Sequence, residues 1–236
     1  MANIINPYRF ATSGGGFSND YSVEFDGVDQ HCDLGFGTPA TSRLTWSGWV
    51  KTTDTTGVLI VDSGTGYNKD SRGGIMWYSG YWYLSMGNGE TWSYSLNTLD
   101  ASAALDGNWH HVAAVIDGYD WTVYVDGEED CTWTATVSAG TASSYDMAIG
   151  AAYNLYFPID GKIDEVAFFT SALSSSDITA IYNSGKPASL SSYSPYGWWR
   201  MGDNDSGSGT TITDQGSGGN DGTLENSPTY STDVPT

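Results

Sequence analysis

Basic residues are scarce in this sequence. Lysine and arginine together number 8 among 236 residues, against 28 aspartates and glutamates, and the formal net charge is −20 at pH 7. A nucleic-acid ligand needs a basic stripe to neutralise its phosphates, and anionic membranes attract polybasic segments. The sequence therefore predicts that neither nucleic acid nor a membrane is a partner. Most of the acids stand at turn positions, where turn chemistry and a solubilising surface account for them.

Long apolar runs are also missing. No run of roughly 18 apolar residues is present, so no membrane-spanning segment is expected. The first ten residues lack the basic start and the apolar stretch of a signal peptide. Cysteine is nearly absent, and two residues, Cys32 and Cys131, are too few to indicate a redox compartment. Whether these two cysteines pair is left open.

Helical periodicity is rare, and alternation of apolar and polar residues takes its place. Aromatic residues make up 14% of the chain and glycine numbers 30, a composition typical of twisted antiparallel sheets joined by tight turns. We expect strands at 21–29, 42–52, 57–62, 74–86, 109–117, 121–126 and 131–137. Ser79-Gly80, Asp117-Gly118 and Asp126-Gly127 predict hairpin turns, because such turns need positive φ angles. The sequence predicts an all-β fold, an antiparallel β-sandwich jelly roll with one short helix.

The single helix is expected directly after Ser174. Ser174 and Asp177 have the spacing of a capping box, with Asp in place of the usual Glu. Ile178, Ile181 and Tyr182 then form a narrow apolar stripe. Gly185 suits the left-handed position after a helix, and Pro187 prevents its continuation.

Three segments are expected along the chain. Residues 1–20, which end in a glycine-rich stretch, predict a flexible N-terminal arm. Residues 21–186 form the sandwich. Residues 187–236 are a linker and a C-terminal tract that either completes the sandwich or docks on a partner.

Four segments in order resemble laminin G-like domains, which are jelly rolls of the concanavalin A-type lectin/glucanase fold. They are Phe25-Asp-Gly27, Leu44-Thr-Trp-Ser-Gly-Trp-Val50, the pair Trp109-His-His-Val-Ala-Ala-Val115 and Val123-Tyr-Val-Asp-Gly127, and Gly161-Lys-Ile-Asp-Glu-Val-Ala-Phe168. The resemblance covers roughly residues 20–186. It implies the fold and leaves the ligand open, because this fold hosts lectins, adhesion modules, hydrolases and virion proteins.

The C-terminal tract carries a second resemblance. Gly197-Trp-Trp-Arg-Met-Gly-Asp203 and Thr210–Leu224 are similar to a stretch that lies just before the Phe-Asp-Gly strand in laminin G-like domains, whereas here that strand lies at the other end of the chain. Either the two ends meet in one sandwich, or the tail serves a neighbouring subunit. The tract also resembles repeated segments of marine phage structural proteins.

Hydrolases that the chain resembles carry Glu-x-Asp-x-Glu along one strand, where alternate side chains share a face. The nearest matches are Glu24 with Asp26, which has Val28 in place of a third acid, and Glu128–Asp130, which begins at a predicted turn. His110 and His111 are adjacent, so in a strand they point to opposite faces and cannot chelate one metal together. The sequence therefore predicts no enzymatic activity.

A structural calcium ion is the cofactor that the resemblance implies, and the matching positions for its ligands are Asp26 and Asp164. Calcium prefers carboxylate and carbonyl oxygens. The alternative for Asp164 is an edge position with its carboxylate in water, since an unpartnered buried carboxylate between apolar neighbours would be costly.

Aromatic residues crowd the predicted hairpin at 74–86. Alternation sends about half of them into the core, and the exposed ones could stack on sugar rings. Trp82 and Trp92 are the predicted carbohydrate-binding residues, and sandwich packing is the alternative for each ring.

The two resemblances, together with the missing catalytic motifs, imply a non-enzymatic virion surface protein, either a capsid decoration or a head- or tail-fibre module. Its expected partners are other virion proteins, in a symmetric homo-oligomer, and a host cell-surface glycan. The alternative is a free carbohydrate-binding or adhesion lectin. The glycan, the docking partner and the oligomeric state are left open.

Overall fold

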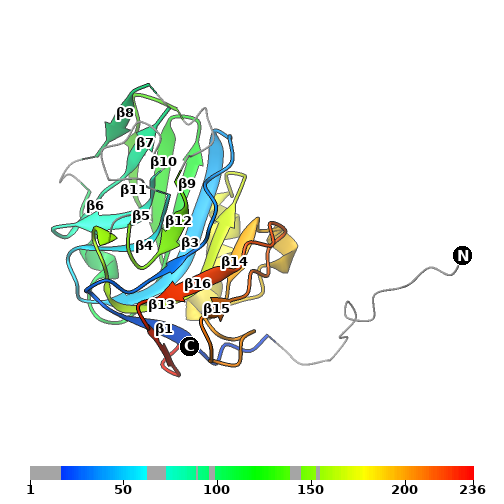
Figure 1. The fold of residues 1–236 in the computed structure, drawn as a ribbon. Helices are drawn as coiled ribbons and strands as arrows, with labels where there is room; N and C mark the ends of the chain where they lie inside the picture. Colours follow the sequence, from blue (N-terminus) through cyan, green and yellow to red (C-terminus); the bar gives the residue numbers. More distant parts are fainter. Residues whose placement is uncertain (1–16, 63–72, 89, 96–98, 139–144, 153–154) are drawn as a thin grey trace, which may run out of the picture.

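The protein is a sandwich of two antiparallel sheets (Figure 1). The computed structural model describes residues 17–62, 73–88, 90–95, 99–138, 145–152 and 155–236. In these residues the predicted all-β class, the two-sheet arrangement and the short helix are confirmed. Most of the predicted arm, residues 1–20, lies outside the described residues.

Sheet A has the strand order β11-β10-β9-β3-β13-β1-β17, and β14 also pairs with β13. Its strands are β1 (Ser22–Asp26), β3 (Arg43–Thr52), β9 (Trp109–Asp117), β10 (Asp120–Val125), β11 (Glu128–Thr134), β13 (Asp160–Phe169), β14 (Gly197–Trp199) and β17 (Thr229–Ser231).

Sheet B has the order β15-β16-β2-β12-β4-β5-β6. Its strands are β2 (His31–Asp33), β4 (Gly57–Asp62), β5 (Gly73–Tyr78), β6 (Tyr81–Trp82), β12 (Met147–Ile149), β15 (Thr211–Ile212) and β16 (Gly222–Glu225). A separate pair is formed by β7 (Ser85–Gly87) and β8 (Trp92–Tyr94). The described helical elements are α1 (Ser175–Tyr182) and the 3₁₀ turns η1 (Ser102–Ala104), η3 (Asn183–Gly185) and η4 (Ser191–Tyr193).

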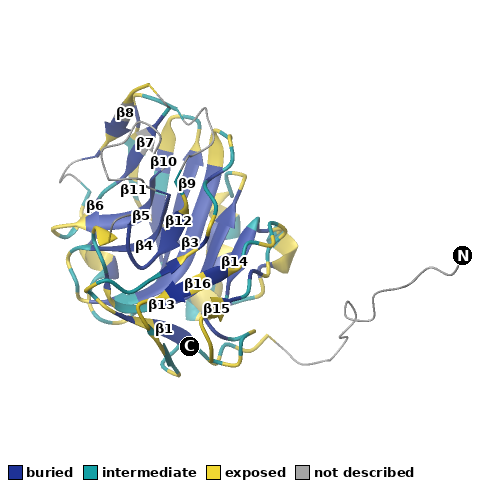
Figure 2. Ribbon diagram, in the orientation of Figure 1, coloured by how far each residue is buried: buried dark blue, intermediate teal, exposed yellow. Residues whose placement is uncertain are grey.

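Tryptophans fill the space between the sheets. The largest fully buried side chains include Trp46, Trp77, Trp82, Trp121 and Trp199, contributed by both sheets. The rings of Trp46 and Trp121 stack with their centroids 5.9 Å apart. Figure 2 shows the buried strands running through the centre of the sandwich, with exposed residues concentrated in the turns.

The outer faces of the two sheets are covered differently. Helix α1 packs on the outer face of sheet A. Its Ile178 shares an apolar cluster with Ala113 of β9, and its Ile181 shares another with Ala167 of β13. Sheet B carries a separate apolar cluster on its outer face, formed mainly by side chains of β4 and β5. This second face holds the candidate site.

Both ends of the chain lie in the same sandwich. Val23 of β1 pairs with Tyr230 of β17, Cys32 of β2 pairs with Leu224 of β16, and Ala167 of β13 pairs with Trp198 of β14. The C-terminal tract thus adds strands to both sheets.

The state of the two cysteines and the length of the helices bear on questions that the sequence raises. Cys32 is buried in sheet B and Cys131 is half-buried on β11 of sheet A, and both thiols are free. Within the described part of the chain, no helix combines the length and the apolarity that crossing a bilayer requires.

Candidate functional site

The β5–β6 hairpin separates its aromatic residues by type. Its turn, Ser79-Gly80, has φ angles of 52° and 80°, as a two-residue hairpin requires. The register pairs Trp77 with Trp82 and Tyr78 with Tyr81. Because paired side chains share a face and successive pairs alternate, the two tryptophans point into the core and the two tyrosines point outward. Tyr78 is 47% exposed and Tyr81 38% exposed.

The prediction that Trp82 is exposed is wrong. Only 1% of this residue is accessible, and its ring meets Trp77 edge-on at 6.3 Å. Its indole Nε1 donates a hydrogen bond of 2.8 Å to the Asp130 carboxylate, which satisfies the polar end of a buried ring. Trp92 lies in β8 opposite Gly87, and its side chain falls outside the described part of the structure.

Aromatic rings gather on the outer face of sheet B around β4, β5 and β6, and we name this area the tyrosine surface. Its floor is the apolar cluster of Val58, Val61, Met76 and Ala152. Its rings are Tyr78, Tyr81, Tyr83, Tyr94, Tyr156 and Phe157.

The rings of the tyrosine surface contact one another in two groups. Tyr78 meets Phe157 edge-on with centroids 5.6 Å apart, and Tyr156 lies 6.2 Å from Phe157. Tyr83 and Tyr94 stack at 6.2 Å. Tyr83 lies beside Met76, since its N–H donates to the Met76 carbonyl at 3.0 Å. Met76 and Tyr78 are two residues apart on β5, a separation of about 7 Å along the strand, so the two groups form one extended surface.

The segment after β12 presents Tyr156 and Phe157 in a strained backbone. Leu155 and Phe157 have φ angles of 62° and 55°, a region that bulky residues rarely adopt. The segment is held by hydrogen bonds from Ala152 N to the Tyr156 carbonyl and from Leu155 N to the Ala152 carbonyl. Strain of this kind costs on the order of 1–3 kcal/mol per residue and is concentrated at binding sites. Tyr156 remains 53% exposed.

Sequence reasoning missed Tyr78, Tyr81, Tyr94 and Tyr156 as the exposed rings of this surface. A signal for the first two was present. Once Ser79-Gly80 is taken as the turn, one face of the hairpin holds Ile75, Trp77, Trp82 and Leu84, and the other holds Met76, Tyr78, Tyr81 and Tyr83. The first set is the more apolar, so it belongs in the core.

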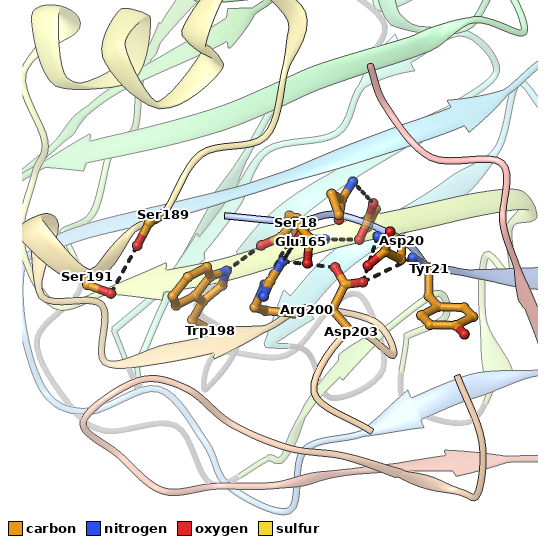
Figure 3. Close-up of polar contacts among 11 residues, drawn as sticks. Ser18, Asp20, Tyr21, Glu165, Ser189, Ser191, Trp198, Arg200 and Asp203 are labelled. Atoms are coloured by element: carbon orange, nitrogen blue, oxygen red, sulfur yellow. Dashed lines mark hydrogen bonds and ion pairs between the residues drawn. The ribbon is translucent and has the colours of Figure 1, made fainter. Parts of the chain in front are cut away.

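A charged cluster lies where the start of the described chain meets the C-terminal tract (Figure 3). Glu165 is 4% exposed and accepts hydrogen bonds from Arg200 Nε at 2.8 Å and Trp198 Nε1 at 2.6 Å. A terminal guanidinium nitrogen of Arg200 donates to Asp203 at 2.9 Å and also to the Ser18 carbonyl. The guanidinium carbon of Arg200 lies over the Phe17 ring, 4.3 Å from the centroid of that ring.

A β-bulge in β13 creates this cluster. The pairing of β13 with β3 shifts register between Asp164 and Ala167, and Glu165 has a φ of 47°. Burial raises the pKa of Glu165 to about 7 against the opposing effect of Arg200, and burial together with the adjacent Glu165 charge raises the pKa of Asp164. The hydrogen bonds of Arg200, Glu165 and Asp203 are made within the chain, so this cluster ties residues 17–21 to the C-terminal tract.

The laminin G family model described as the concanavalin A-like lectin/glucanases superfamily matches residues 26–179. The chain belongs to this superfamily. No curated protein is significantly similar to it in sequence.

Two solved structures share the superfamily fold at low sequence identity. A protein from Bacteroides ovatus ATCC 8483, provisionally named a carbohydrate binding protein, has 18% identity and a TM-score of 0.64 over 93% of this chain and 62% of its own. This chain therefore spans less than two thirds of that relative. A native heptameric SAP-like pentraxin from Limulus polyphemus has 18% identity and a TM-score of 0.51, over 70% of this chain and 82% of its own.

The two acids predicted as calcium ligands do not fit one shared site. Asp26 pairs with Asp160 at one end of β13, so Asp164 lies four residues further along, about 13 Å away. Asp26 is exposed and accepts from Val28 N at 3.0 Å, whereas Asp164 is fully buried and accepts from Asn19 Nδ2 and Glu165 N, both at 2.8 Å. The edge position proposed for the Asp164 carboxylate is therefore wrong. In the described residues no group of three or more His, Cys, Asp or Glu side chains is placed to hold a metal, and calcium stays an untested prediction.

The acids that the sequence offers as candidates for glycoside hydrolysis face the solvent. Glu24 and Asp26 are exposed on β1, and Glu128, Glu129 and Asp130 are exposed on the edge strand β11. Asp130 is already engaged by Trp82. Glycoside hydrolysis needs two carboxylates that converge on the scissile bond, so a catalytic pair among these acids would have to act at the exposed surface of β1 or β11.

Proposed function

We propose that this protein is a non-enzymatic carbohydrate-binding module and that the tyrosine surface is its binding face. The observation that carries the proposal is the presence of Tyr78, Tyr81 and Tyr156 at 38–53% exposure beside an apolar floor. Exposed rings of this kind offer flat apolar faces with a polar tip, the combination that suits the mixed surface of a sugar.

The superfamily and the name of the Bacteroides ovatus neighbour support a carbohydrate ligand. The spread of the rings supports a ligand of several sugar units. They come from β5, β6, β8 and the 155–157 segment, so a single sugar ring would cover only part of the surface.

The binding proposal is tested with a double variant, Tyr78→Ala with Tyr156→Ala, against a panel of soluble polysaccharides in affinity electrophoresis. We expect the wild type to be retarded by at least one polysaccharide and the variant to bind it at least tenfold more weakly, a loss of about 1.4 kcal/mol. Tyr119→Ala is the matched control, because Tyr119 is 52% exposed but lies at the β9–β10 turn of sheet A.

Three outcomes separate the possibilities. Retardation of the wild type and of Tyr119→Ala, but not of the double variant, supports the proposal. Equal retardation of all three proteins places the binding face elsewhere, and no retardation in any polysaccharide overturns a carbohydrate function. Release of reducing sugars during incubation would contradict the non-enzymatic part.

A virion surface and a free lectin are two settings for the same binding function. The virion setting is supported by the resemblance of the C-terminal tract to phage structural proteins. This tract supplies β14, β15, β16 and β17 to the sandwich, so a particle would have to hold the protein through another surface. Mass spectrometry of purified particles that finds the protein at fixed copy number would support the virion setting, and its absence would favour the free lectin.

A further inference from the structure

Carboxylates surround the turn that carries Tyr78 and Tyr81. Asp100 forms an isolated antiparallel bridge with Tyr81, so the two backbones lie side by side and the two side chains share a face. The Asp100 carboxylate accepts a hydrogen bond from Ser102 N at 2.8 Å, and donors from Ser102 lower its pKa, which keeps it charged at neutral pH. One negative charge therefore borders the tyrosine surface at β6.

A second carboxylate lies on the other side of the same turn. Gly80 N donates to the Thr55 carbonyl at 2.8 Å and Ser79 N donates to Thr56 Oγ1 at 3.3 Å, so residues 54–56 run beside the turn. Asp54 caps this segment by accepting from Thr56 N at 3.0 Å. The turn is thus bordered by Asp54 and Asp100.

Four of the five described basic side chains form ion pairs elsewhere in the molecule. Arg43 pairs with Asp117 at 2.7 Å, Lys51 and Lys162 both pair with Asp233 at 2.8 Å, and Arg200 pairs with Glu165 and Asp203. Lys186 directly follows η3, after the helix that covers sheet A. Among the described residues no cation borders the tyrosine surface, and the whole chain carries a net charge of −20.

We infer that the tyrosine surface selects uncharged glycan chains and rejects those that carry carboxylate or sulfate groups, sialylated and uronic-acid glycans included. The inference rests on the proposed carbohydrate-binding function. An anionic sugar would approach two fixed carboxylates and a negative molecule, and the described residues offer it no counter-charge, whereas a neutral sugar keeps its ring contacts and meets no such barrier. The rejection acts within roughly 10 Å at 0.1 M salt, which reaches a sugar stacked on Tyr78 or Tyr81.

The test begins with the neutral polysaccharide that the wild type binds best in the panel described above. That polysaccharide is converted into a carboxymethylated derivative and into a hydroxyethylated derivative of equal substitution, which adds similar bulk without charge. We expect the carboxymethylated form to bind at least tenfold more weakly than the hydroxyethylated form at low salt. Raising the salt to 0.5 M should narrow this difference, because screening weakens the repulsion.

The variant that tests the source of the rejection is Asp54→Asn with Asp100→Asn, since asparagine keeps the oxygen that caps each turn. It should bind the carboxymethylated form roughly fivefold more tightly than the wild type does, and the hydroxyethylated form equally. Glu225→Gln is the matched control: Glu225 is exposed on β16, four strands and about 19 Å from β5 in the same sheet, and should change neither affinity.

The failures of the two proposals are distinguishable. The charge selection is overturned if the carboxymethylated form binds as tightly as the hydroxyethylated form. It is also overturned if only anionic polysaccharides retard the protein. Both outcomes leave carbohydrate binding intact. A preference that Asp54→Asn with Asp100→Asn does not change also overturns the charge selection. Absence of binding to every polysaccharide, neutral or charged, overturns the proposed function itself.

Discussion

His110 and His111 are neighbours on β9 with opposite electrostatic surroundings. His110 Nδ1 lies 2.8 Å from the Asp126 carboxylate and Nε2 lies 3.0 Å from that of Asp106, and these bonds raise the pKa of His110. His111 is 1% exposed between the rings of Trp49 and Tyr182, and burial lowers its pKa to about 4. The two side chains point to different sides of the strand, as the sequence predicts for adjacent residues.

The two histidines are expected to move stability in opposite directions with pH. For His111 the unfolded chain binds the proton more tightly than the folded chain does. The contribution of neutral His111 to the free energy of unfolding is therefore complete above pH 6.5. It falls by about 3 kcal/mol as the pH decreases towards 4. For His110 the folded state binds the proton more tightly, so its contribution is present below pH 6.5 and is lost as the pH rises through the raised pKa.

Urea unfolding followed by tryptophan fluorescence between pH 4 and 8 measures both effects. His111→Phe keeps a ring against Trp49 and should show a shallower loss of stability at acidic pH than the wild type. His110→Gln should lose stability relative to the wild type mainly below pH 6.5. Parallel pH profiles for all three proteins would contradict this assignment.

At the scale of single elements, α1 depends on the residue that precedes it, its N-cap Ser174. Ser174 Oγ accepts from Asp177 N at 3.2 Å, and the Asp177 carboxylate accepts from Ser174 N at 3.0 Å, which completes the predicted capping box. Ser174→Ala should lower the free energy of unfolding by about 1 kcal/mol. Ser175→Ala, one residue later and exposed, is the control and should have little effect. An equal loss of unfolding free energy in both variants would show that the cap does not stabilise the helix.

How far the sequence predicts an element depends on how local its determinants are. The turn at Ser79-Gly80 and the capping box that begins at Ser174 depend only on residues within four positions of one another, and the structure confirms both. The end of α1 differs: Asn183 is already left-handed at φ 50°, ahead of the predicted Gly185, because asparagine tolerates this region. Asp126-Gly127 has two positive φ angles, whereas at Asp117-Gly118 only Gly118 does.

The site itself was only partly predictable, because its parts are joined by contacts distant in sequence. Alternation predicts that half of the aromatic residues in the 74–86 hairpin face outward, but Phe157 reaches Tyr78 from a segment some 80 residues further on. The bulge that sends both Asp164 and Glu165 away from the core leaves no trace in the alternation of Ile163-Asp-Glu-Val166. Arg200 and Asn19, the partners of these acids, lie at opposite ends of the chain.

At the scale of the whole molecule, the C-terminal tract is part of the hydrophobic core. Trp199, Met201, Ile212 and Leu224 belong to the same buried cluster as Phe25 and the central strands. Near its end, Asp233 accepts hydrogen bonds from Lys51 and Lys162 at 2.8 Å and from Trp109 Nε1 at 3.0 Å, and the two lysines lower its pKa. The tract therefore contributes both apolar burial and strand pairing to the sandwich.

Removal of the tract should consequently prevent stable folding of the remainder. A chain that ends at residue 190 loses β14, β15, β16 and β17, which uncovers the edge of β1 and exposes the side of the core that Trp199 fills. Unpaired edge strands with apolar neighbours promote aggregation. We expect this truncated chain to be largely insoluble or to unfold at a markedly lower temperature in differential scanning fluorimetry.

A second, smaller deletion and a complementation experiment separate core burial from the loss of the tail alone. A chain that ends at residue 225 loses β17 and the Asp233 contacts but keeps Trp199 and Leu224, so it should be destabilised less than the chain that ends at 190. Coexpression of residues 191–236 with the shorter chain should recover soluble protein, because the missing strands can pair from a separate polypeptide. A chain ending at 190 that stays monomeric with an unchanged melting temperature would instead identify the tract as an independent element whose strands are available to a partner.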